Sequence, residues 1–385
     1  MQVLEEGRIT KEALEEWSKR VGAKLRITWC FNELASKETI RNWVFGVGDP
    51  NPLWVEENYA KHTRYGCLVA PPSWFYSVFP TYVQQGLPGV HAFHSGNDWE
   101  FYRPVLIGDK IRPESIFAGF DVKPSQFSGK LVLEYQLASY FNQRNEMVAK
   151  AKTWLVRSER GEARKKGKYS ELQLPHPWTE EELRKIEDDA MAEQIRGSEV
   201  RYWEDVEIGE KLPPVIKGPL GLTDIIAFFA GSGVISLRAH GLAFRVYRQH
   251  PSWSFRDPET YALEPIAGVH WNKHAAQAAG LPSQYNAGIE TQSWLIELLT
   301  SWMGDEGWLK TNYAQYRHFI YFSDVVWFTG TVTRKYIDEN GEYCLNIETS
   351  GINQRGEDTT PGRATVILPS RKAGTWPVER RLPAR

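Results

Sequence analysis

The sequence has few cysteines and no excess of charge of one sign. Its 385 residues contain only Cys30, Cys67 and Cys344, which lie far apart. Three distant thiols cannot build a disulfide framework or a four-thiolate zinc site, and they favour a reducing compartment. The 46 basic and 48 acidic residues leave a formal net charge of −2. This balance provides no global attraction to nucleic acid or to anionic lipid, so neither is an expected partner.

Long hydrophobic runs are also missing. The longest apolar stretch, residues 225–237, is too short to span a bilayer and contains Gly231, Ser232 and Gly233. Residues 1–20 are acidic and have the pattern of a helix, without the basic and apolar parts of a signal peptide. We therefore expect a cytoplasmic protein without membrane contact.

Metal-ligand patterns are not found either. His91, His94 and His274 have no cysteine or acidic partner at ligand spacing, so no metal site is expected. Aromatic residues, in contrast, are abundant: there are 16 tryptophans, 17 tyrosines and 17 phenylalanines. Taken alone, this excess indicates only large amphipathic surfaces, many of which must lie in the core.

The chain is a diverged duplication. Near the end of each half the same phrase occurs, Phe-Asn-Gln-Arg-Asn-Glu at 141–146 and Ile-Asn-Gln-Arg-Gly-Glu at 352–357. Each phrase has the pattern of a strand, a turn and a strand. Thr39 matches Thr223 at an offset of 184 residues, whereas Gly66 matches Gly280 at an offset of 214. The difference of 30 residues indicates an insertion in the second copy, around 234–264.

This repeat defines the expected domain organisation. We expect two domains joined by a linker and followed by a tail, with the bounds 1–156, 157–199, 200–370 and 371–385. The linker begins with a charge run at 157–168, which is typical of a solvated segment; a phosphate-binding patch is the alternative. Thr179 and Glu182 then have the spacing of a helix capping box.

Each copy is expected to contain a helix followed by strands. In the first copy, apolar residues recur at helical spacing over 39–48. Segments with strand patterns follow in both copies: 116–122, 130–141, 147–156, 325–335, 343–352 and 363–368. One helix followed by three or more strands, made twice, predicts an α+β fold with antiparallel sheet around a helix.

The most informative run is Gly-Asp-Pro-Asn-Pro-Leu-Trp at 48–54, followed by Tyr59 and Ala60. It closely resembles the MaoC-like family of R-specific enoyl-CoA hydratases and dehydratases, in which this run is Gly-Asp-x-Asn-Pro-(Ile/Leu)-His. The Arg-Pro pair at 103–104 and the Gly-Asp pair at 108–109 are similar to later parts of the same family pattern.

The resemblance covers both copies and carries an expectation about the fold. The second copy contributes openings at 201–209 and 218–224 that resemble those of such domains. The family resemblance implies a double hotdog fold of the α+β class. In this fold two tandem hotdog domains each wrap an antiparallel sheet around a long helix, and the two sheets pair side by side.

The resemblance also implies a catalytic pair. Family hydratases use the aspartate and histidine of a single run to activate one water for syn addition to an enoyl thioester. The first copy has Asp49 and Asn51, but Trp54 occupies the histidine position. In the second copy His270 occupies the histidine position, whereas Pro265 stands at the aspartate position. Neither copy holds a complete pair, and His270 is the expected catalytic histidine.

Three interpretations of the missing carboxylate are open. In the first, a carboxylate of the insertion pairs with His270, and the candidates are Glu264, Asp257 and Glu259. In the second, Asp49 reaches His270 across the interface between the copies. In the third, the site is inactive.

The turn before Gly288 is expected to bind the substrate. In the family, a glycine at the start of a helix offers its backbone N–H to the thioester oxygen, and Gly288 is the matching residue. Tyr285, Trp271 and Asn51 are expected to contribute to the same site. The matching turn of the first copy holds two prolines, which lack N–H donors, so the second copy is the expected reacting half. Asp49 and Asn51 also suit a turn that caps a helix, which is their structural alternative.

We therefore expect an acyl-thioester hydratase or dehydratase that adds or removes water at a 2,3-enoyl bond, with an acyl-CoA as substrate. No cofactor is expected, because CoA is here a part of the substrate, to which the acyl group is bound as a thioester. The alternatives are a non-catalytic acyl-CoA-binding subunit of a larger dehydratase and a hotdog thioesterase, for which Glu290 is the candidate carboxylate. Since family members self-associate, a homodimer or a complex with a related hotdog subunit is expected.

Four tryptophans have positions near the expected site. They are Trp54 in the histidine position, Trp74 after the proline turn, Trp271 beside His270, and Trp294 after the Gly288 turn. Large rings around a pocket favour a bulky or aromatic acyl group over a short linear one.

Overall fold

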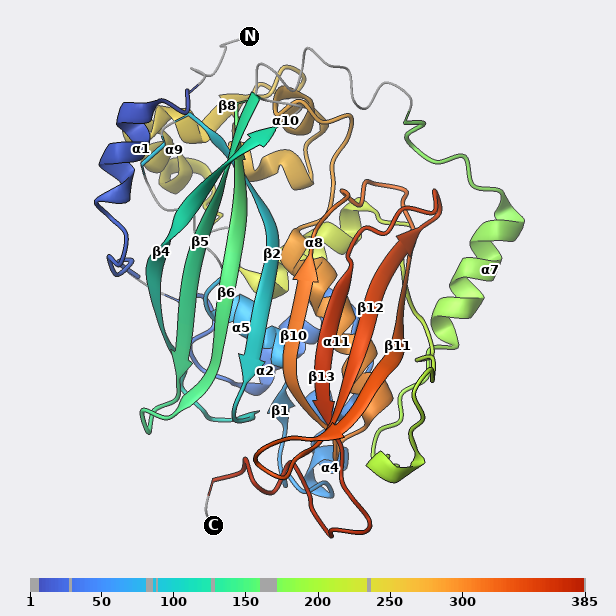
Figure 1. Cartoon of the computed structure of the whole chain (residues 1–385). Helices are drawn as coiled ribbons and strands as arrows, with labels where there is room; N and C mark the ends of the chain where they lie inside the picture. Colours follow the sequence, from blue (N-terminus) through green and yellow to red (C-terminus); the bar gives the residue numbers. More distant parts are fainter. Residues whose placement is uncertain are drawn as a thin grey trace.

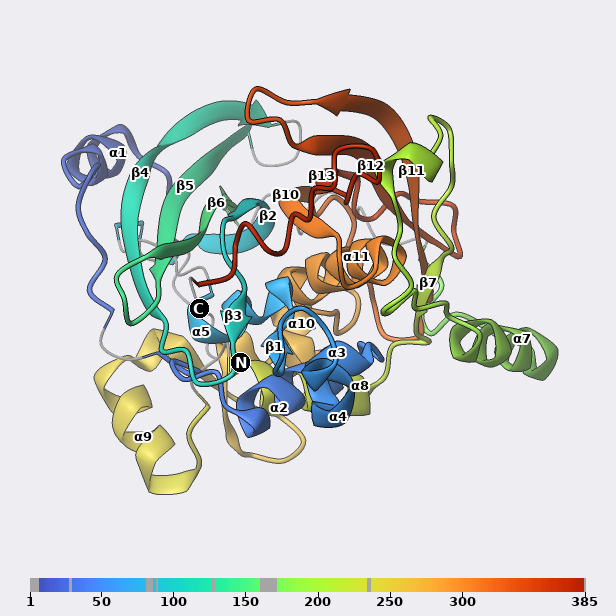
Figure 2. The ribbon, with the colours of Figure 1, turned by 90° about the horizontal axis from the view of Figure 1, so that it is seen from below.

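One large antiparallel sheet and a layer of helices against one of its faces make up most of the molecule (Figures 1 and 2). The computed structural model describes residues 7–27, 30–80, 86–87, 89–125, 129–159, 172–233 and 237–383. The sheet has nine strands in the order β4-β5-β6-β2-β10-β13-β12-β11-β7.

The two copies each supply one side of this sheet. The strands of the first copy are β2 (His91–Phe101), β4 (Arg112–Ser125), β5 (Gly129–Phe141) and β6 (Met147–Ser158). Those of the second copy are β7 (Val215–Lys217), β10 (Trp308–Gln315), β11 (Val326–Ile337), β12 (Tyr343–Asn353) and β13 (Gly362–Ile367). The copies meet where β2 pairs with β10, with Trp99 opposite Asn312. The six predicted strand segments are therefore confirmed, whereas β2 and β10, the two strands of the seam, were not among them.

The helix α11 (Gly288–Met303) is the central helix of the second copy, and every residue after Gly288 is buried. In the first copy the corresponding position holds only η1 (Pro72–Trp74) and α5 (Phe75–Val78). The helix ends there because Phe79 adopts an extended conformation and Pro80 follows it. A long central helix is thus present in the second copy, and a short one replaces it in the first.

The matching helices of the duplication, α2 (Lys37–Val47) and α8 (Leu222–Ser232), pack directly against each other. A Cβ atom on Gly46 would lie 2.8 Å from the carbonyl oxygen of Ala227, and one on Gly231 would lie 2.2 Å from that of Asn42. The two backbones therefore approach each other through glycines, where no side chain intervenes.

Smaller elements connect these layers. On the first-copy side they are α1 (Lys11–Ser18), α3 (Pro52–Val55), α4 (Glu57–Lys61), β1 (Val69–Ala70) and β3 (Val105–Leu106). The linker forms α7 (Glu180–Met191), capped by Thr179 and Glu182 as the spacing predicts, and η2 (Trp203–Asp205) follows. The rest of the predicted charge run, from residue 160 to 168, lies outside the described residues.

The insertion of the second copy forms a unit of its own beside the helix layer. Its elements are α9 (His240–Gln249), η3 (Pro251–Trp253), β8 (Ser254–Arg256) and β9 (Leu263–Pro265), and η4 (Ile266–His270) and α10 (Lys273–Ala278) follow it. Residues 234–236 of the predicted insertion are not among the described residues. The β8 and β9 strands pair only with each other, so the insertion does not extend the main sheet.

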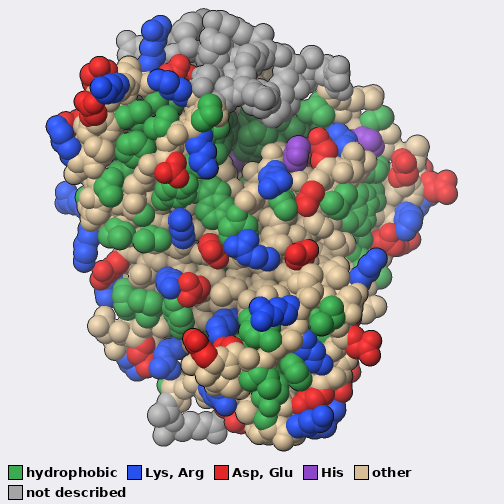
Figure 3. Space-filling view, in the orientation of Figure 1, with side chains coloured by type: hydrophobic (Ala, Val, Ile, Leu, Met, Phe, Trp, Pro, Cys, Tyr) green, Lys and Arg blue, Asp and Glu red, His purple; other side chains and the backbone are tan. Residues whose placement is uncertain are grey.

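The outer face of the sheet is a mixed surface. Figure 3 shows this face, on which acidic and basic side chains are interspersed with apolar ones. No helix in the described part of the chain is long and apolar enough to cross a membrane.

Candidate active site

His270 ends η4 and lies against the segment that leads into α11. Its Nδ1 atom is 2.8 Å from the backbone carbonyl oxygen of Tyr285. Because a carbonyl oxygen can only accept, Nδ1 carries the proton of the neutral ring and Nε2 presents a lone pair. The rings of Phe229 and Tyr285 pack against the imidazole, with centroids 5.5 and 4.8 Å away. Burial lowers the pKa of His270 to about 4, so the ring is neutral at pH 7.

The insertion holds the His270 segment in place. Asn272 caps α10 through its side-chain oxygen, which accepts from the Ala275 N–H at 3.0 Å. The Nδ2 group of the same residue donates to Asp257 at 2.7 Å. The amide of Asn272 lowers the pKa of Asp257 to about 2, with help from nearby backbone N–H groups. The carboxylate of Asp257 therefore anchors the polypeptide two residues after His270.

The N-terminal end of α11 lies next to this histidine. Tyr285, whose carbonyl accepts from His270, is three residues before Gly288, the first residue of the helix. No side chain of the described residues caps this end of α11, so N–H groups of its first turn have no capping partner. A Cβ atom on Gly288 would lie 2.4 Å from the ring of Tyr316, so this position requires glycine. The structure thus brings together His270, Tyr285 and Gly288, three of the residues that the sequence predicted for one site.

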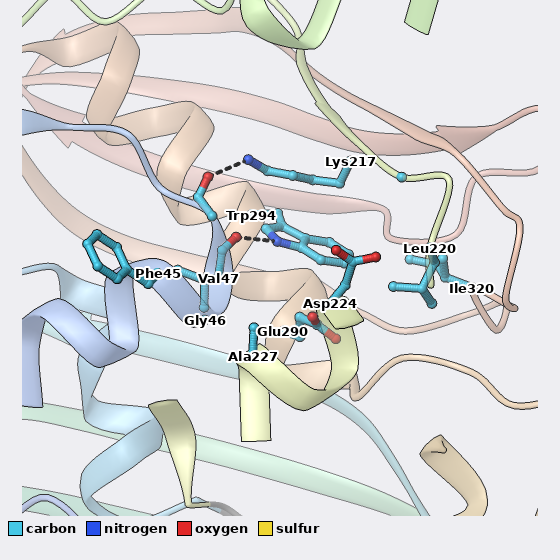
Figure 4. A pocket seen from close by; sticks show the side chains of 12 residues that line it. Phe45, Gly46, Val47, Lys217, Leu220, Asp224, Ala227, Glu290, Trp294 and Ile320 are labelled. Atoms are coloured by element: carbon cyan, nitrogen blue, oxygen red, sulfur yellow. Dashed lines mark hydrogen bonds between the residues drawn. The ribbon is translucent and has the colours of Figure 1, made fainter. Parts of the chain in front are cut away.

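Glu290 lies in the first turn of the same helix and borders a cavity of about 130 Å³ (Figure 4). It is 1% exposed, and among the described residues its Oε2 atom has no hydrogen-bond partner. Burial raises the pKa of this carboxyl group well above its usual value, and the charge of Asp224 on α8 adds to the effect. Figure 4 shows Asp224 and Glu290 on one side of the cavity. Glu290 therefore keeps its proton to a higher pH than an exposed glutamate does.

Asn286 lies between the two titratable groups. A hydrogen bond to its backbone acts to raise the pKa of His270, against the larger effect of burial. A hydrogen bond to its side chain acts to lower the pKa of Glu290, again against burial. The same side chain donates to Thr291 at 2.6 Å. The described structure therefore connects His270 and Glu290 through one residue.

A buried ion pair lies across the cavity from Glu290. The Lys217 ammonium group donates to Glu297 at 2.7 Å and to the carbonyl oxygen of Gly48 at 2.9 Å. Burial acts to lower the pKa of Lys217, but the carboxylates of Glu297 and Glu193 outweigh it and the pKa is raised. This lysine joins the end of α2 to the middle of α11.

Asp49 has partners of its own in the first copy. Its Oδ1 atom accepts from the Asn51 N–H at 3.0 Å, and its Oδ2 atom accepts from the Trp54 indole N–H at 2.9 Å. Asn51 caps α3 by accepting from the Leu53 N–H at 3.0 Å. Burial raises the pKa of Asp49 to about 6. Within the described residues no hydrogen bond or ion pair connects Asp49 or Asn51 to His270.

The carboxylates of the insertion also have other neighbours. Glu264 lies on β9 opposite Phe255, and its charge helps to raise the pKa of Tyr247 in α9. Glu259 forms an ion pair of 3.0 Å with His274. Within the described part of the chain no hydrogen bond or ion pair joins Glu264 to His270, so its catalytic role stays a prediction. In the same part of the chain, no group of three or more His, Cys, Asp or Glu side chains is placed to hold a metal ion.

A polar network across the seam was not predicted from the sequence. Gln292 on α11 accepts from Tyr76 of the first copy at 2.9 Å and from Tyr316 at 2.8 Å, and it donates to Asn312 at 2.6 Å. The signal that could have revealed it is the presence of Glu290, Gln292 and Glu297 inside an otherwise apolar helical pattern. Buried polar groups of this kind are retained only where partners satisfy them.

The four singled-out tryptophans do not all surround the cavity. Trp54 and Trp74 are core residues, 4% and 0% exposed. Trp294 lines the cavity and donates to the carbonyl oxygen of Val47 at 2.9 Å. Trp271 packs edge-on against Phe229, which also contacts His270. Only the last two tryptophans are therefore placed near the expected chemistry.

Comparison with known proteins agrees with this architecture. Residues 28–151 match a family model described as FAS1-like, dehydratase domain region. A UPF0336 protein from Streptomyces avermitilis is 29% identical over 82 residues, which are 20% of this chain and 55% of that protein. The matched segment thus spans about half the length of this curated relative.

Solved structures cover nearly the whole chain. One described as a MaoC-like dehydratase is 15% identical, covers 91% of this chain and 98% of its own, and has a TM-score of 0.63. A putative MaoC domain protein dehydratase from Chloroflexus aurantiacus is 12% identical and covers 91% and 96%, with a TM-score of 0.50. A conserved hypothetical protein from Mycobacterium tuberculosis, described as having a double hotdog fold, is 10% identical and covers 90% and 96%, with a TM-score of 0.51. The double hotdog fold and the resemblance to the MaoC-like dehydratases are confirmed.

Proposed function

We propose that this chain hydrates or dehydrates an acyl thioester at its 2,3-bond, with acyl-CoA as the substrate. The observation that carries the proposal is the position of His270. A neutral imidazole, held with its proton on Nδ1, lies beside the uncapped N-terminal end of a central helix. A general base and a set of backbone N–H donors at one place are the two requirements of water addition to an enoyl thioester.

The proposed hydration begins at Nε2 of His270. This nitrogen accepts a proton from water while the water oxygen forms a bond to C3 of the substrate. The electron pair of the double bond moves toward the thioester carbonyl, and the Gly288 N–H stabilises the negative charge on that oxygen. C2 then takes a proton, and dehydration is the same sequence in reverse. These steps need no metal or redox cofactor.

Glu290 is the proposed donor of the proton to C2. Its carboxyl group is buried, has a pKa raised by that burial and borders the cavity. It lies in the first turn of α11, and Asn286 links it to His270. Among the open interpretations of the missing carboxylate, this assignment replaces Glu264 and Asp49 as the partner we favour.

The nature of the acyl group is a further part of the proposal. The cavity of about 130 Å³ is smaller than the roughly 300–1,000 Å³ of most ligand pockets, and Glu290 lines it whereas His270 and Gly288 do not, so it would receive only a part of the substrate beside Glu290. Trp271 and Phe229 pack together beside His270 and would contact the remainder of the chain. We therefore retain a bulky or aromatic acyl group as the preferred substrate, to be tested against short crotonyl-type thioesters.

Two further proposals concern the cell and the assembly. All three cysteines are free, which supports a cytoplasmic location. The outer strands β4 and β7 end the sheet on its two sides, and we propose a homodimer or a complex with a related hotdog subunit.

The central experiment measures hydration of a panel of 2-enoyl-CoA thioesters by the full chain. We expect His270→Ala to lower kcat/KM by about 10²- to 10⁴-fold, which is the usual contribution of a general base. His274→Ala is the matched control, because that ring lies four residues further on and pairs with exposed Glu259. Hydration that survives His270→Ala would contradict the assignment. Binding of acyl-CoA without turnover by the unmodified protein would instead support a non-catalytic subunit.

A second candidate function is thioester hydrolysis, because Glu290 is a buried carboxyl group at the helix end where the thioester carbonyl would bind. Its raised pKa opposes this function, since a base or nucleophile must be ionised. The two functions differ in product. Release of free CoA thiol that Glu290→Gln abolishes would favour hydrolysis, whereas consumption of the double bond without thiol release favours hydration.

A further inference from the structure

The ring of Tyr316 lies directly against the first residue of α11. A Cβ atom added to Gly288 would lie 2.4 and 2.6 Å from the Cδ2 and Cε2 atoms of this ring. No side chain fits between the two, so the helix backbone and the ring are in direct contact. Gly288 and Tyr316 are both half-buried, so part of each is exposed beside the N-terminal end of the helix.

The hydroxyl group of Tyr316 reaches the same helix one turn later. It donates to Oε1 of Gln292 at 2.8 Å, and the hydroxyl group of Tyr76 donates to the same oxygen at 2.9 Å. The Nε2 group of Gln292 donates to Asn312 at 2.6 Å. Gln292 lies four residues after Gly288, so its backbone N–H pairs with the Gly288 carbonyl group in the helix. Tyr316 thus contacts the first turn of α11 at both of its ends.

The first copy holds Tyr316 from its other side. The backbone N–H of Tyr316 donates to the carbonyl oxygen of Ser95 on β2 at 2.9 Å. His94 of the same strand packs edge-on against the ring, with centroids 5.1 Å apart. The hydroxyl oxygen of Tyr316 also lies 3.4 Å from Oδ1 of Asn97. The position of the ring is therefore determined by the sheet, and the ring in turn contacts the helix.

A buried network connects this contact to the seam between the copies. Gln292, Asn312 and Asn97 are 0%, 0% and 1% exposed. Asn312 lies on β10 and Asn97 on β2, the two strands that pair at the seam. Because a buried polar group that loses its partner is costly, the network opposes a displacement of Gln292. The first turn of α11 is therefore attached to both copies.

The matching helix of the first copy has no comparable donor. It begins at Pro72, which follows Pro71, and proline has no N–H to offer to a thioester oxygen. The first copy therefore supplies no such N–H at this position, but its strand β2 supports Tyr316 beside the N–H group of Gly288.

We propose that Tyr316 is a positioning residue, which fixes the first turn of α11 so that the Gly288 N–H points at the thioester oxygen. The inference rests on the proposed function, since it assigns a further residue to the same site. A hydrogen-bond donor stabilises the transition state only where it already points at the developing charge, and a shift of about 1 Å costs up to about 10²-fold in rate. Substrate binding depends less on this alignment, because the stronger interaction is made in the transition state.

The first test measures kcat and KM of the full chain with its best 2-enoyl-CoA substrate. Tyr316→Leu removes the ring and the hydroxyl group, and Tyr316→Phe removes the hydroxyl group alone. We expect Tyr316→Leu to lower kcat by about 10- to 100-fold with less than about a threefold change in KM, and we expect Tyr316→Phe to lie between it and the unmodified chain. The matched control is Tyr313→Phe on the same strand end, where the ring stacks on Trp154 and, within the described residues, no hydrogen bond or ring contact joins it to α11. This control should leave kcat unchanged.

The second test requires no turnover. The probe is 4-dimethylaminocinnamoyl-CoA, whose absorption moves to longer wavelength when a hydrogen-bond donor polarises the thioester carbonyl group. We expect a red shift when the probe binds the unmodified chain, a smaller shift with Tyr316→Phe and the smallest with Tyr316→Leu. Thermal unfolding checks that each variant is folded, and if Tyr316→Leu is not, Tyr316→Phe decides by the same two measurements.

The outcomes separate this inference from the proposed function. Folded Tyr316 variants with the kcat and the red shift of the unmodified chain would overturn the positioning role. A lower kcat with an unchanged red shift would also overturn it, because Tyr316 would then act at another place. No binding of the probe by the unmodified chain, or binding without a red shift, would overturn it as well. If the chain hydrates no enoyl thioester but shows a red shift that the Tyr316 variants lose, the positioning role stands and the proposed function fails.

Discussion

Two local contacts determine the tautomer and the pKa of the His270 imidazole. The Tyr285 carbonyl determines which nitrogen carries the proton, and the surrounding rings remove water from the ring. The first contact determines the tautomer and the second lowers the pKa to about 4. The same residue in an exposed loop would be half protonated near pH 6.5. The environment therefore keeps Nε2 available as a base over the whole neutral range.

This pKa predicts the pH dependence of the reaction. His270 must be neutral to accept a proton, so activity is lost as pH falls through its folded-state pKa. We expect kcat/KM for hydration to be constant from pH 7 to pH 6 and to fall on an acid limb near pH 4. A steady-state pH profile checks this expectation. An acid limb between pH 6 and 7 would show that His270 is solvated or is not the base.

Glu290 yields a second prediction at the residue scale. Because burial raises the pKa of its carboxyl group and so favours the neutral form, glutamine is a neutral replacement of nearly the same shape. We expect Glu290→Gln to change the free energy of unfolding by less than about 1 kcal/mol and to lower hydration by about 10²-fold or more, since the amide is a poor proton donor. Urea unfolding and initial rates measure the two effects. Full activity in this variant would leave Glu290 a purely structural role.

At the scale of elements, close contacts fix the positions of α2, α8 and α11 relative to one another. Gly231 on α8 lies against the backbone of α2, and Lys217 after β7 reaches both Gly48 and Glu297. These contacts connect the two copies at the cavity. The geometry of the candidate site therefore depends on helices from both halves of the chain.

Gly231→Ala tests the direct contact between the matching helices. The added Cβ would lie 2.2 Å from the carbonyl oxygen of Asn42, so the helices must separate. We expect a loss of about 1–3 kcal/mol in the free energy of unfolding, as for other overpacked cores. The matched control is Gly241→Ala in α9, where nothing lies within 4 Å and where stability should be unchanged or higher by up to about 1 kcal/mol. Equal melting temperatures for the two variants would contradict the close contact.

Lys217→Met tests the buried ion pair. The substitution leaves the carboxylate of Glu297, 1% exposed, without its cationic partner. Removing one member of a buried pair costs about 3–5 kcal/mol, and we expect a loss of that order in urea unfolding. The double variant Lys217→Met with Glu297→Gln should recover part of the loss, because no charge is then buried alone. A double variant less stable than Lys217→Met would argue against the pair.

At the scale of the whole molecule, the sheet is continuous across the duplication. Residues of β2 pair with residues of β10, and Gln292 joins Tyr76 of the first copy to Asn312 of the second. Separation of the copies would expose the backbone groups of both seam strands and leave this polar network without partners. Such edges promote aggregation.

We therefore predict that neither half folds alone. Residues 1–171 and residues 172–385, expressed separately, should aggregate or lack cooperative thermal unfolding, whereas co-expression should restore a soluble complex. Size-exclusion chromatography and circular dichroism check this expectation. A monodisperse, cooperatively folded half would show that the seam is dispensable.

Much of the fold could be predicted from the repeat and its periodicity. Six strand segments, the capped helix after Thr179 and the matched helices at 39–48 and 223–232 followed from local patterns. The seam strands were missed because Asn97 and Asn312, which are buried, replace the apolar residues that a strand pattern requires. Asn97 donates to Thr153 on β6 and Asn312 accepts from Gln292 on α11, and a local window contains neither of these partners.

Some features of the candidate site were also expected from the sequence, and others are visible only in the structure. His270 and Gly288 were expected from the resemblance to the MaoC-like family, and the structure places them at one helix end. The pairing of Asp49 with Trp54, the raised pKa of Glu290 and the choice of nitrogen in His270 could not be predicted from the sequence. The sequence by itself determined the duplication and its α+β class, because spacing reports which side of a segment is buried, and its resemblance to a known family supplied the candidate residues. Only the tertiary structure decided their protonation and partners, because burial and hydrogen bonding depend on groups that come from distant segments.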